Sequence, residues 1–150
     1  MRSDPVVRVQ RAGTTDATAV EAFAGAFDHA IRTDETARFL RDDRHHLLLG
    51  YLDDRPAGFV SAVEIFHPDK SPELFLNEIG VVEGSRRHGV AHALIEELAR
   101  VARERGCVQI WVLTDEDNEA AMRLYGGTGG RWEGRRQVMF EYDLTEEPGS

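Results

Sequence analysis

The amino-acid sequence predicts a single α/β domain. The chain has 150 residues, a length that buries one hydrophobic core and rarely two. Short stretches rich in valine, isoleucine and leucine alternate with amphipathic stretches whose apolar residues recur at helical spacing. Hydrophobic residues make up 41% of the chain and charged residues 30%, as in an ordered globular protein, and no internal repeat or linker is evident. We therefore expect residues 1–150 to form one domain.

The charge of the chain excludes one class of partner and favours another. Asp and Glu number 27 against 18 Lys and Arg, and a net charge of −9 argues against binding to nucleic-acid phosphates and favours cationic partners. No apolar run approaches the roughly 20 residues that span a bilayer, and the N-terminus lacks the basic-then-apolar order of a secretory signal. We expect a cytoplasmic protein without a membrane partner, in which the single Cys107 is a buried core thiol rather than a nucleophile.

The first half of the chain carries three strand patterns and two helix patterns. Valines at positions 6, 7 and 9 indicate a first strand. Start signals at residues 14–16 precede apolar side chains at helical spacing at positions 20, 23, 24 and 27, and a shorter helix is expected after Thr33. Residues 47–52 and 57–66 then predict an antiparallel hairpin joined by a turn at residues 53–56.

The second half continues the alternation of strands and helices. A strand is expected at residues 74–82, then the strongest helix, which begins near Gly89 and ends at Gly106. A strand at residues 108–113 precedes a short helix from Asn118 to about Tyr125. Glycines at positions 126, 127, 129 and 130 break the chain, residues 137–144 alternate as a final strand does, and residues 146–150 read as a disordered tail.

The turn between the strand at 74–82 and the following helix predicts an anion site. Unpaired backbone N–H groups and the positive end of the helix dipole meet there. Gly89 permits close backbone approach, Ala91 is small, and Arg86 and Arg87 add positive charge to an acidic chain. The GxxxxGK[ST] and GxGxxG patterns of the two commonest phosphate-binding turns are absent. The chemistry suits a diphosphate.

These residues resemble the signature of the GNAT superfamily of N-acetyltransferases. Its Arg/Gln-x-x-Gly-x-Gly/Ala motif is matched by Arg86, Gly89 and Ala91, and its later Asn-x-x-Ala-x-x-x-Tyr pattern by Asn118, Ala121 and Tyr125. The resemblance implies a GNAT fold: a mixed, mostly antiparallel sheet of six or seven strands, splayed near residues 74–82, with helices on both faces. It also implies acetyl-CoA as the donor, in contact with Val81, Val82, Arg86, Arg87, His88, Gly89, Val90, Ala91, Asn118 and Tyr125.

Within the superfamily the chain looks like the aminoglycoside 3-N-acetyltransferases. The resemblance rests on residues 71–81 (SPELFLNEIGV), 86–95 (RRHGVAHALI) and 111–115 (WVLTD), followed by Leu124 and Tyr125. It implies acetylation of an aminoglycoside amine, at the 3-amino group, with resistance as the consequence. Two alternatives stay open: a GNAT enzyme that acetylates a protein N-terminus, a lysine or a small metabolic amine, and a non-catalytic acyl-CoA-binding module. Many relatives dimerise, so a homodimer also stays open.

Two residues are candidates for proton transfer. An alkylammonium of pKa about 10 must lose a proton before it attacks a thioester. Glu78 matches an acidic position in the resembling family and is the leading general base, directly or through water. Glu73 is the second candidate, but a regular strand places it on the opposite face unless a bulge intervenes, as the resemblance implies. The phenol of Tyr125 is placed to protonate the departing thiolate, although both carboxylates also suit an exposed strand edge and Tyr125 a core anchor.

Acidic residues are the candidates for binding the amine. Asp115 leads the cluster of acids at positions 115, 116, 117 and 119, although acids beside Asn118 also favour a helix N-terminus, where Asn118 itself is a good cap. Asp28 and Glu35 lie in the N-terminal helical region. The predicted substrate-binding set is therefore Glu73, Glu78, Asp115, Asp28 and Glu35. The six histidines form no recognised zinc spacing, so no metal is expected.

Overall fold

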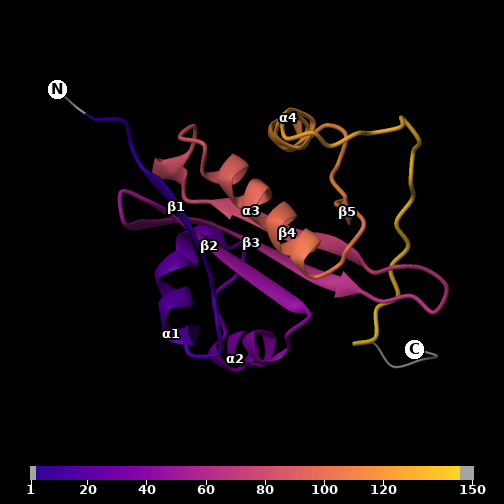
Figure 1. The fold of residues 1–150 in the computed structure, drawn as a ribbon, viewed down its shortest axis with the longest axis horizontal. Coiled ribbons are helices and arrows are strands. Elements are labelled where there is room, and N and C mark those ends of the chain that lie inside the picture. Colours follow the sequence, from indigo (N-terminus) through magenta and orange to yellow (C-terminus); the bar gives the residue numbers. More distant parts are fainter. Residues whose placement is uncertain (1–2, 146–150) are drawn as a thin grey trace.

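The computed structural model describes residues 3–145 as a twisted sheet with helices packed against it (Figure 1). The sheet within these residues runs in the order β1-β2-β3-β4-β5. Neighbouring strands are antiparallel except for β4 and β5, which are parallel. The strands are β1 (Val7–Arg11), β2 (His45–Leu52), β3 (Arg55–Ile65), β4 (Glu73–Val81) and β5 (Ile110–Trp111).

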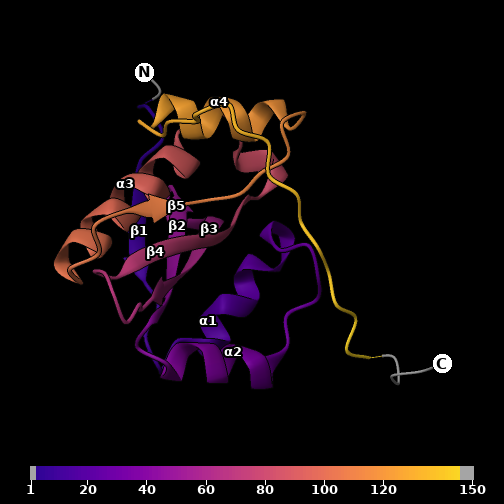
Figure 2. The ribbon, with the colours of Figure 1, turned by 90° about the vertical axis from the view of Figure 1, so that its right-hand side faces the viewer.

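Helices cover both faces of the sheet, as the sequence predicted (Figure 2). The N-terminal helices lie against one face, α3 lies against the other, and α4 lies beyond α3. The helices are α1 (Ala17–Val20), α2 (Thr33–Arg41), α3 (Val90–Glu104) and α4 (Glu119–Gly127), and the 3-10 turns are η1 (Glu21–Ala26) and η2 (Glu83–Ser85). The helix expected at residues 14–27 is therefore one turn of α-helix followed by a 3-10 helix.

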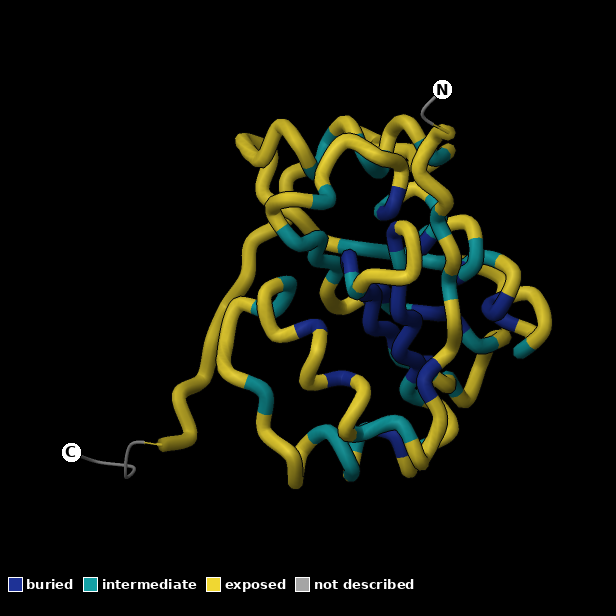
Figure 3. The backbone as a smooth tube through the Cα atoms, turned by 90° about the vertical axis from the view of Figure 1, so that its left-hand side faces the viewer, coloured by how far each residue is buried: buried dark blue, intermediate teal, exposed yellow. Residues whose placement is uncertain are grey.

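The core has two halves, one on each side of the sheet. Successive residues of β2 point to opposite faces, so Leu48 packs with Leu94 and Leu98 of α3, while Leu47 and Leu49 pack with the N-terminal helices. Figure 3 shows the buried residues gathered along the central strands. The sheet is thus packed on both faces, and this packing holds its strands in place at the ends where a ligand could bind.

The predicted hairpin between β2 and β3 is confirmed, with a tighter turn than expected. Asp53 and Asp54 both have positive φ, 49° and 61°, which is the backbone of a two-residue turn that matches strand twist. Arg55 and Pro56, expected in the turn, already pair with β2. Asp residues tolerate this conformation better than most non-glycine residues.

A β-bulge interrupts β4 beside Glu78, the predicted general base. Ser61 of β3 lies opposite Glu78, and Ala62 lies opposite Leu76, which leaves Asn77 without a partner. The extra residue reverses the alternation of faces, because Leu74 and Leu76 before it and Ile79 and Val81 after it all join the core beneath α3. Glu73 and Glu78 therefore share the face that carries the N-terminal helices, as the implied bulge required.

The predicted number of strands, six or seven, is wrong for the part of the chain that the structure describes. Residues 137–144 alternate in polarity but pair with no strand there, and residues 131–145 are exposed throughout. A strand needs a partner edge as well as an alternating sequence. The strand expected at 108–113 pairs only over Ile110 and Trp111. The predicted tail at 146–150 lies outside the described residues, and no helix within them is long and apolar enough to cross a membrane.

Candidate active site

A cleft of about 930 Å³ opens where β4, α3 and α4 approach one another. Its lining includes the end of β4, the turn before α3, the first turn of α3 and one side of α4. Six of the predicted donor-binding residues near the turn line this cleft: Val81, Arg86, Arg87, Gly89, Val90 and Ala91. Val82 and His88 belong to the same turn but do not line it.

The first turn of α3 presents its backbone N–H groups to the cleft. Gly89 is the N-cap residue, its φ is 81°, and no side chain caps the helix, so the first N–H groups keep their capacity to bind an anion. A Cβ atom at Gly89 would meet no heavy atom within 4 Å. Arg87 also has a positive φ, 68°, which tightens the turn. The guanidinium groups of Arg86 and Arg87 belong to this same turn. This geometry fits a diphosphate.

The opposite wall of the cleft is α4. Asn118 caps the helix, because its Oδ1 accepts a hydrogen bond of 3.1 Å from the N–H of Ala121, and both Asn118 and Tyr125 line the cleft. Burial raises the pKa of the Tyr125 phenol above its usual value, so the hydroxyl keeps its proton at neutral pH. Tyr125 is therefore a hydrogen donor on the wall of the cleft.

A second, smaller cavity of about 290 Å³ lies between the N-terminal helices and the sheet. We call it the inner cavity. Its walls combine apolar side chains, including Val20, Phe39 and Leu47, with the carboxylates of Asp28, Glu35 and Glu78. Three predicted substrate-binding acids thus meet in one cavity although they come from three different segments of the chain.

The cleft and the inner cavity share a wall. Phe27, Asp28, Asn77 and Glu78 line both. Phe27 is held by stacking on Phe59, with ring centroids 3.7 Å apart and planes within 10°. The β4 bulge therefore places the carboxylate of Glu78 at the junction of the two spaces.

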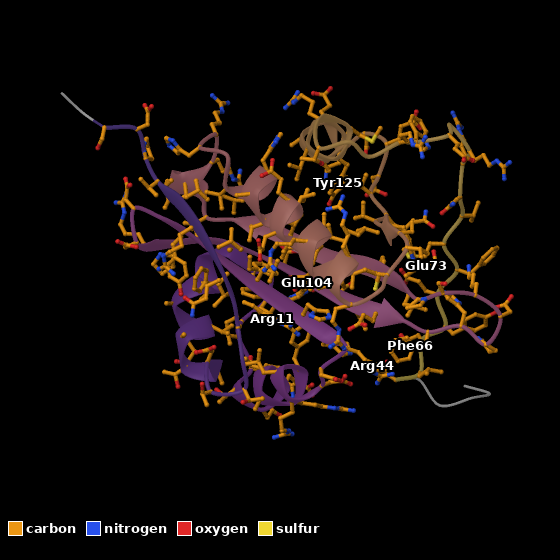
Figure 4. All side chains as sticks on the ribbon, viewed as in Figure 1. Arg11, Arg44, Phe66, Glu73, Glu104 and Tyr125 are labelled. Carbon is orange, nitrogen blue, oxygen red and sulfur yellow. The ribbon has the colours of Figure 1, made fainter. Side chains whose placement is uncertain are left out.

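Two predicted substrate-binding acids lie elsewhere. Glu73 sits at the start of β4, well away from Tyr125 (Figure 4), and lines neither space. Its Oε1 is 2.8 Å from Nζ of Lys70 and 2.9 Å from Nε2 of His67, and the Lys70 ammonium is the main cause of its lowered pKa. Asp115 is exposed and also lies outside both linings.

Sequence reasoning missed several residues of the shared wall and the inner cavity. Phe27 was expected only as a helix-packing residue, and Asn77 and Ser61 were not singled out. The available signal was the bulge itself, because an inserted residue re-aims the side chains on both sides of it. Cys107 is buried as predicted, and burial raises the pKa of its thiol, which disfavours a thiolate nucleophile. Among residues 3–145 no cluster of three His, Cys, Asp or Glu side chains could hold a metal ion.

Comparison with known proteins identifies the family. The model of the acetyltransferase (GNAT) family matches residues 14–129, which include both walls of the cleft. The chain belongs to the GNAT family. GNAT acetyltransferases use acetyl-CoA, and the diphosphate geometry at α3 fits that donor.

Relatives known from their sequences include other N-acetyltransferases. An uncharacterized N-acetyltransferase of Mycobacterium tuberculosis is 28% identical over 120 residues, which cover 80% of this chain and 74% of the relative. The L-2,4-diaminobutyric acid acetyltransferase of Streptomyces coelicolor is 34% identical over 89 residues, which cover 57% of this chain and 51% of that protein.

Solved structures confirm the GNAT fold. An aminoglycoside acetyltransferase from an uncultured soil metagenomic sample, in complex with sisomicin, superposes with a TM-score of 0.83 at 16% identity, covering 92% of this chain and 96% of that one. The aminoglycoside N-acetyltransferase AAC(6')-Iy in complex with CoA gives a TM-score of 0.78 at 19% identity, covering 96% and 99%. At these identities the likeness is one of fold.

Proposed function

We propose that this GNAT acetyltransferase transfers the acetyl group of acetyl-CoA to an amine of an aminoglycoside, at the 3-amino group, and so gives resistance. The observation that carries the proposal is the junction at Glu78, where a diphosphate-binding cleft meets an acid-lined cavity. Two ligands held in these spaces meet at one carboxylate. Direct transfer between them needs this arrangement.

The donor is held chiefly by the turn before α3. The N–H groups of the first turn and the Arg86 and Arg87 guanidinium groups bind the diphosphate of acetyl-CoA, and Asn118 and Tyr125 flank the rest of the cleft. Acetyl-CoA supplies an acetyl group activated as a thioester. The task of the protein is to align it with the amine.

Two side chains handle the protons. The Glu78 carboxylate takes the proton that the amine loses on attack, directly or through a water molecule. The Tyr125 phenol, kept protonated by burial, donates a proton at the sulfur that departs. The buried thiol of Cys107 lines neither the cleft nor the inner cavity and takes no part.

The inner cavity favours a cationic acceptor whose amine-bearing end is small. Its lining holds the three carboxylates of Asp28, Glu35 and Glu78 against the guanidinium of Arg32, which leaves the cavity negative overall. A volume of about 290 Å³ is close to the low end for small-molecule pockets, so one ring of an aminoglycoside enters and the others remain in the open mouth. Sisomicin in the complex of the similar structure is an aminoglycoside, which supports this class of acceptor.

The proposal is tested by supplying purified protein with acetyl-CoA and one amine at a time, and measuring free thiol. The panel holds aminoglycosides, L-2,4-diaminobutyrate as a small metabolic amine, and peptides with a free N-terminus or lysine. We expect turnover on aminoglycosides, and NMR of the product to place the acetyl group on the 3-amine. Turnover only on the other amines would refute the aminoglycoside proposal, and acetyl-CoA binding without turnover on any amine would favour a non-catalytic module.

A matched pair of variants tests the role of Glu78. Glu78→Gln removes the base, and we expect kcat to fall by about 10²-fold or more at neutral pH, with partial recovery as rising pH deprotonates the amine in solution. Glu96→Gln makes the same change at an exposed α3 residue outside both linings and should leave kcat unaltered. An unchanged rate across pH for Glu78→Gln would exclude this carboxylate as the base.

A further inference from the structure

The wall shared by the cleft and the inner cavity carries one large apolar side chain among the described residues. Four of these residues line both spaces, and three of them are polar: Asp28, Asn77 and Glu78. The fourth is Phe27, whose ring is half-buried because it packs on Phe59 and also borders the two spaces. An apolar group that reaches the junction therefore meets the ring of Phe27.

The ring of Phe27 is held against the sheet by its stacking partner. Phe59 lies in the middle of β3 and is only 1% exposed, so the core encloses it. The two ring centroids are 3.7 Å apart with nearly parallel planes. Because side chains in a close-packed core have no free volume to move into, Phe59 cannot give way beneath Phe27.

The backbone that leads to Phe27 is fixed as well. The carbonyl oxygen of Ala26 lies so close to β4 that a Cβ atom on Gly80 would be 2.2 Å from it. The N–H of Phe27 donates a hydrogen bond of 3.3 Å to the carbonyl oxygen of Ala24, which closes the end of η1. Phe27 is thus held through its ring and through its backbone, and it forms a wall of fixed position.

The acyl group of the donor has to reach this wall. Its carbonyl carbon must lie beside Glu78 for an amine in the inner cavity to attack it. The methyl group of an acetyl is apolar, and contact with the carboxylates of Asp28 or Glu78 would strip water from those charges without replacing it. Contact with the ring of Phe27 carries no such cost, so the methyl group fits there.

We propose that Phe27 sets the length of the acyl group that this enzyme transfers and restricts it to acetyl. The inference rests on the proposed transfer at the Glu78 junction, but not on which amine is the acceptor. A longer chain either runs into the ring of Phe27 or turns into the inner cavity, where it takes the place of the amine. The reaction is the same for every acyl group. The amine nitrogen bonds to the carbonyl carbon and the C–S bond breaks, while Glu78 takes the proton of the amine and Tyr125 gives one to the departing sulfur.

The size of the effect follows from the cost of one methylene group. In an apolar pocket, one methylene too many changes kcat/KM by about 10-fold to 200-fold. We therefore expect the wild-type protein to use propionyl-CoA at least about tenfold less well than acetyl-CoA, and butyryl-CoA less well still. All three donors share the CoA moiety, so its contacts with the turn before α3 cancel from the ratio of their kcat/KM values.

The test measures thiol release with acetyl-CoA, propionyl-CoA and butyryl-CoA and one accepted amine. Phe27→Ala removes the phenyl ring, which is larger than the methylene groups that butyryl adds. We expect kcat/KM for butyryl-CoA to rise to within about threefold of the value for acetyl-CoA, since the longer chain fills the space of the ring. Phe27→Leu frees less space and should admit propionyl-CoA more readily than butyryl-CoA. If Phe27→Ala does not fold, the shift toward propionyl-CoA in Phe27→Leu carries the test.

Phe39→Ala is the matched control. Phe39 is also a half-buried phenylalanine, and it lines the inner cavity but not the cleft. Its truncation enlarges the space for the amine, so the KM for the amine should change while the preference among the three acyl groups stays as in the wild type. Thermal unfolding of each variant shows that it is folded under the conditions of the assay.

An unchanged acyl preference in a folded Phe27→Ala would overturn the proposal, as would an equal shift in Phe39→Ala. A wild-type protein that uses butyryl-CoA as readily as acetyl-CoA would overturn it too. Failure of the aminoglycoside proposal looks different. The same ratios are then measured with whichever amine is turned over or, if none is, as Kd values for the three acyl-CoAs. A shifted ratio without turnover on aminoglycosides would support the role of Phe27 and refute only the acceptor.

Discussion

Gly80→Ala tests whether β4 and the N-terminal helices approach as closely as the structure shows. A Cβ atom at residue 80 would lie 2.2 Å from the carbonyl oxygen of Ala26 and 2.9 Å from Cε1 of Phe59. Neither neighbour yields easily, since one is backbone and the Phe59 ring is buried and stacked on Phe27. Overpacking of this kind costs about 1–3 kcal/mol, and a backbone clash puts the substitution near about 3 kcal/mol.

Thermal unfolding measures this loss. In a chain of this length about 1 kcal/mol corresponds to roughly 2–4 °C, so Tm should fall by about 6–12 °C. Gly84→Ala is the control, because a Cβ atom there meets nothing within 4 Å, and its effect should stay within about 0.5 kcal/mol. Relief of the clash displaces the backbone at Ala26, which lies two residues before Asp28 of the inner cavity, so we also expect kcat/KM for the amine to fall with Tm. Equal Tm values for the two variants would refute the reasoning.

Three further predictions concern α3 and the buried charges. Gly89→Ala should raise the KM for acetyl-CoA about tenfold, equivalent to about 1.4 kcal/mol, by crowding the diphosphate. Gly106→Ala, at a similar φ of 77° against 81°, should lose the same stability, about 1–2 kcal/mol, without the change in KM. Arg105→Met leaves a buried carboxylate short of a partner and should lower the free energy of unfolding by about 2–4 kcal/mol. Arg100→Met removes only exposed ion pairs and should lose under about 1 kcal/mol in the same urea titration. Burial lowers the pKa of His46 below 6.5 in the folded chain. As the pH falls below about 6.5, His46 therefore binds a proton in the unfolded chain before it does so in the folded chain. Stability should therefore fall as pH drops below about 6.5, by at most about 1.4 kcal/mol per pH unit, and His46→Gln should flatten that slope.

The predictions for Arg105 and His46 concern one cluster of charged and polar side chains, which lies at the end of the sheet away from the cleft. Nε2 of His46 is 2.8 Å from Oε2 of Glu64, and Nε of Arg105 donates to the same oxygen at 2.9 Å. The three side chains join β2, β3 and the end of α3. They are structural, and nothing in the local sequence separates them from ordinary surface charges, because their partners are 18 and 41 residues apart.

Much of the fold was predictable because its elements have local causes. The stripe of α3 and the aspartates of the hairpin turn each fix a local conformation, and both predictions are confirmed. The number of strands was not predictable, because the pairing of strands depends on residues far apart in the sequence. Residues 137–144 have the alternation of a strand, but alternation does not say whether an edge is there to pair with it.

The candidate site likewise has a part that the sequence predicts from local causes and a part that depends on long-range contacts. The turn at Gly89 was found because N–H groups, glycine and arginine act within a few residues of one another. The inner cavity depends on Asp28, Glu35 and Glu78 meeting from separate segments, and on a one-residue bulge at Asn77 that re-aims Glu78. Such a meeting follows from the register of β4 against β3, which periodicity alone does not reveal.

The central claim is that donor and acceptor are held together and react directly at the Glu78 junction. Initial velocities with acetyl-CoA and an accepted amine varied together test it most directly. Direct transfer predicts intersecting double-reciprocal lines, because both substrates must be bound before thiol is released. Parallel lines, together with release of thiol before any amine is added, would show an acetylated enzyme and contradict the account.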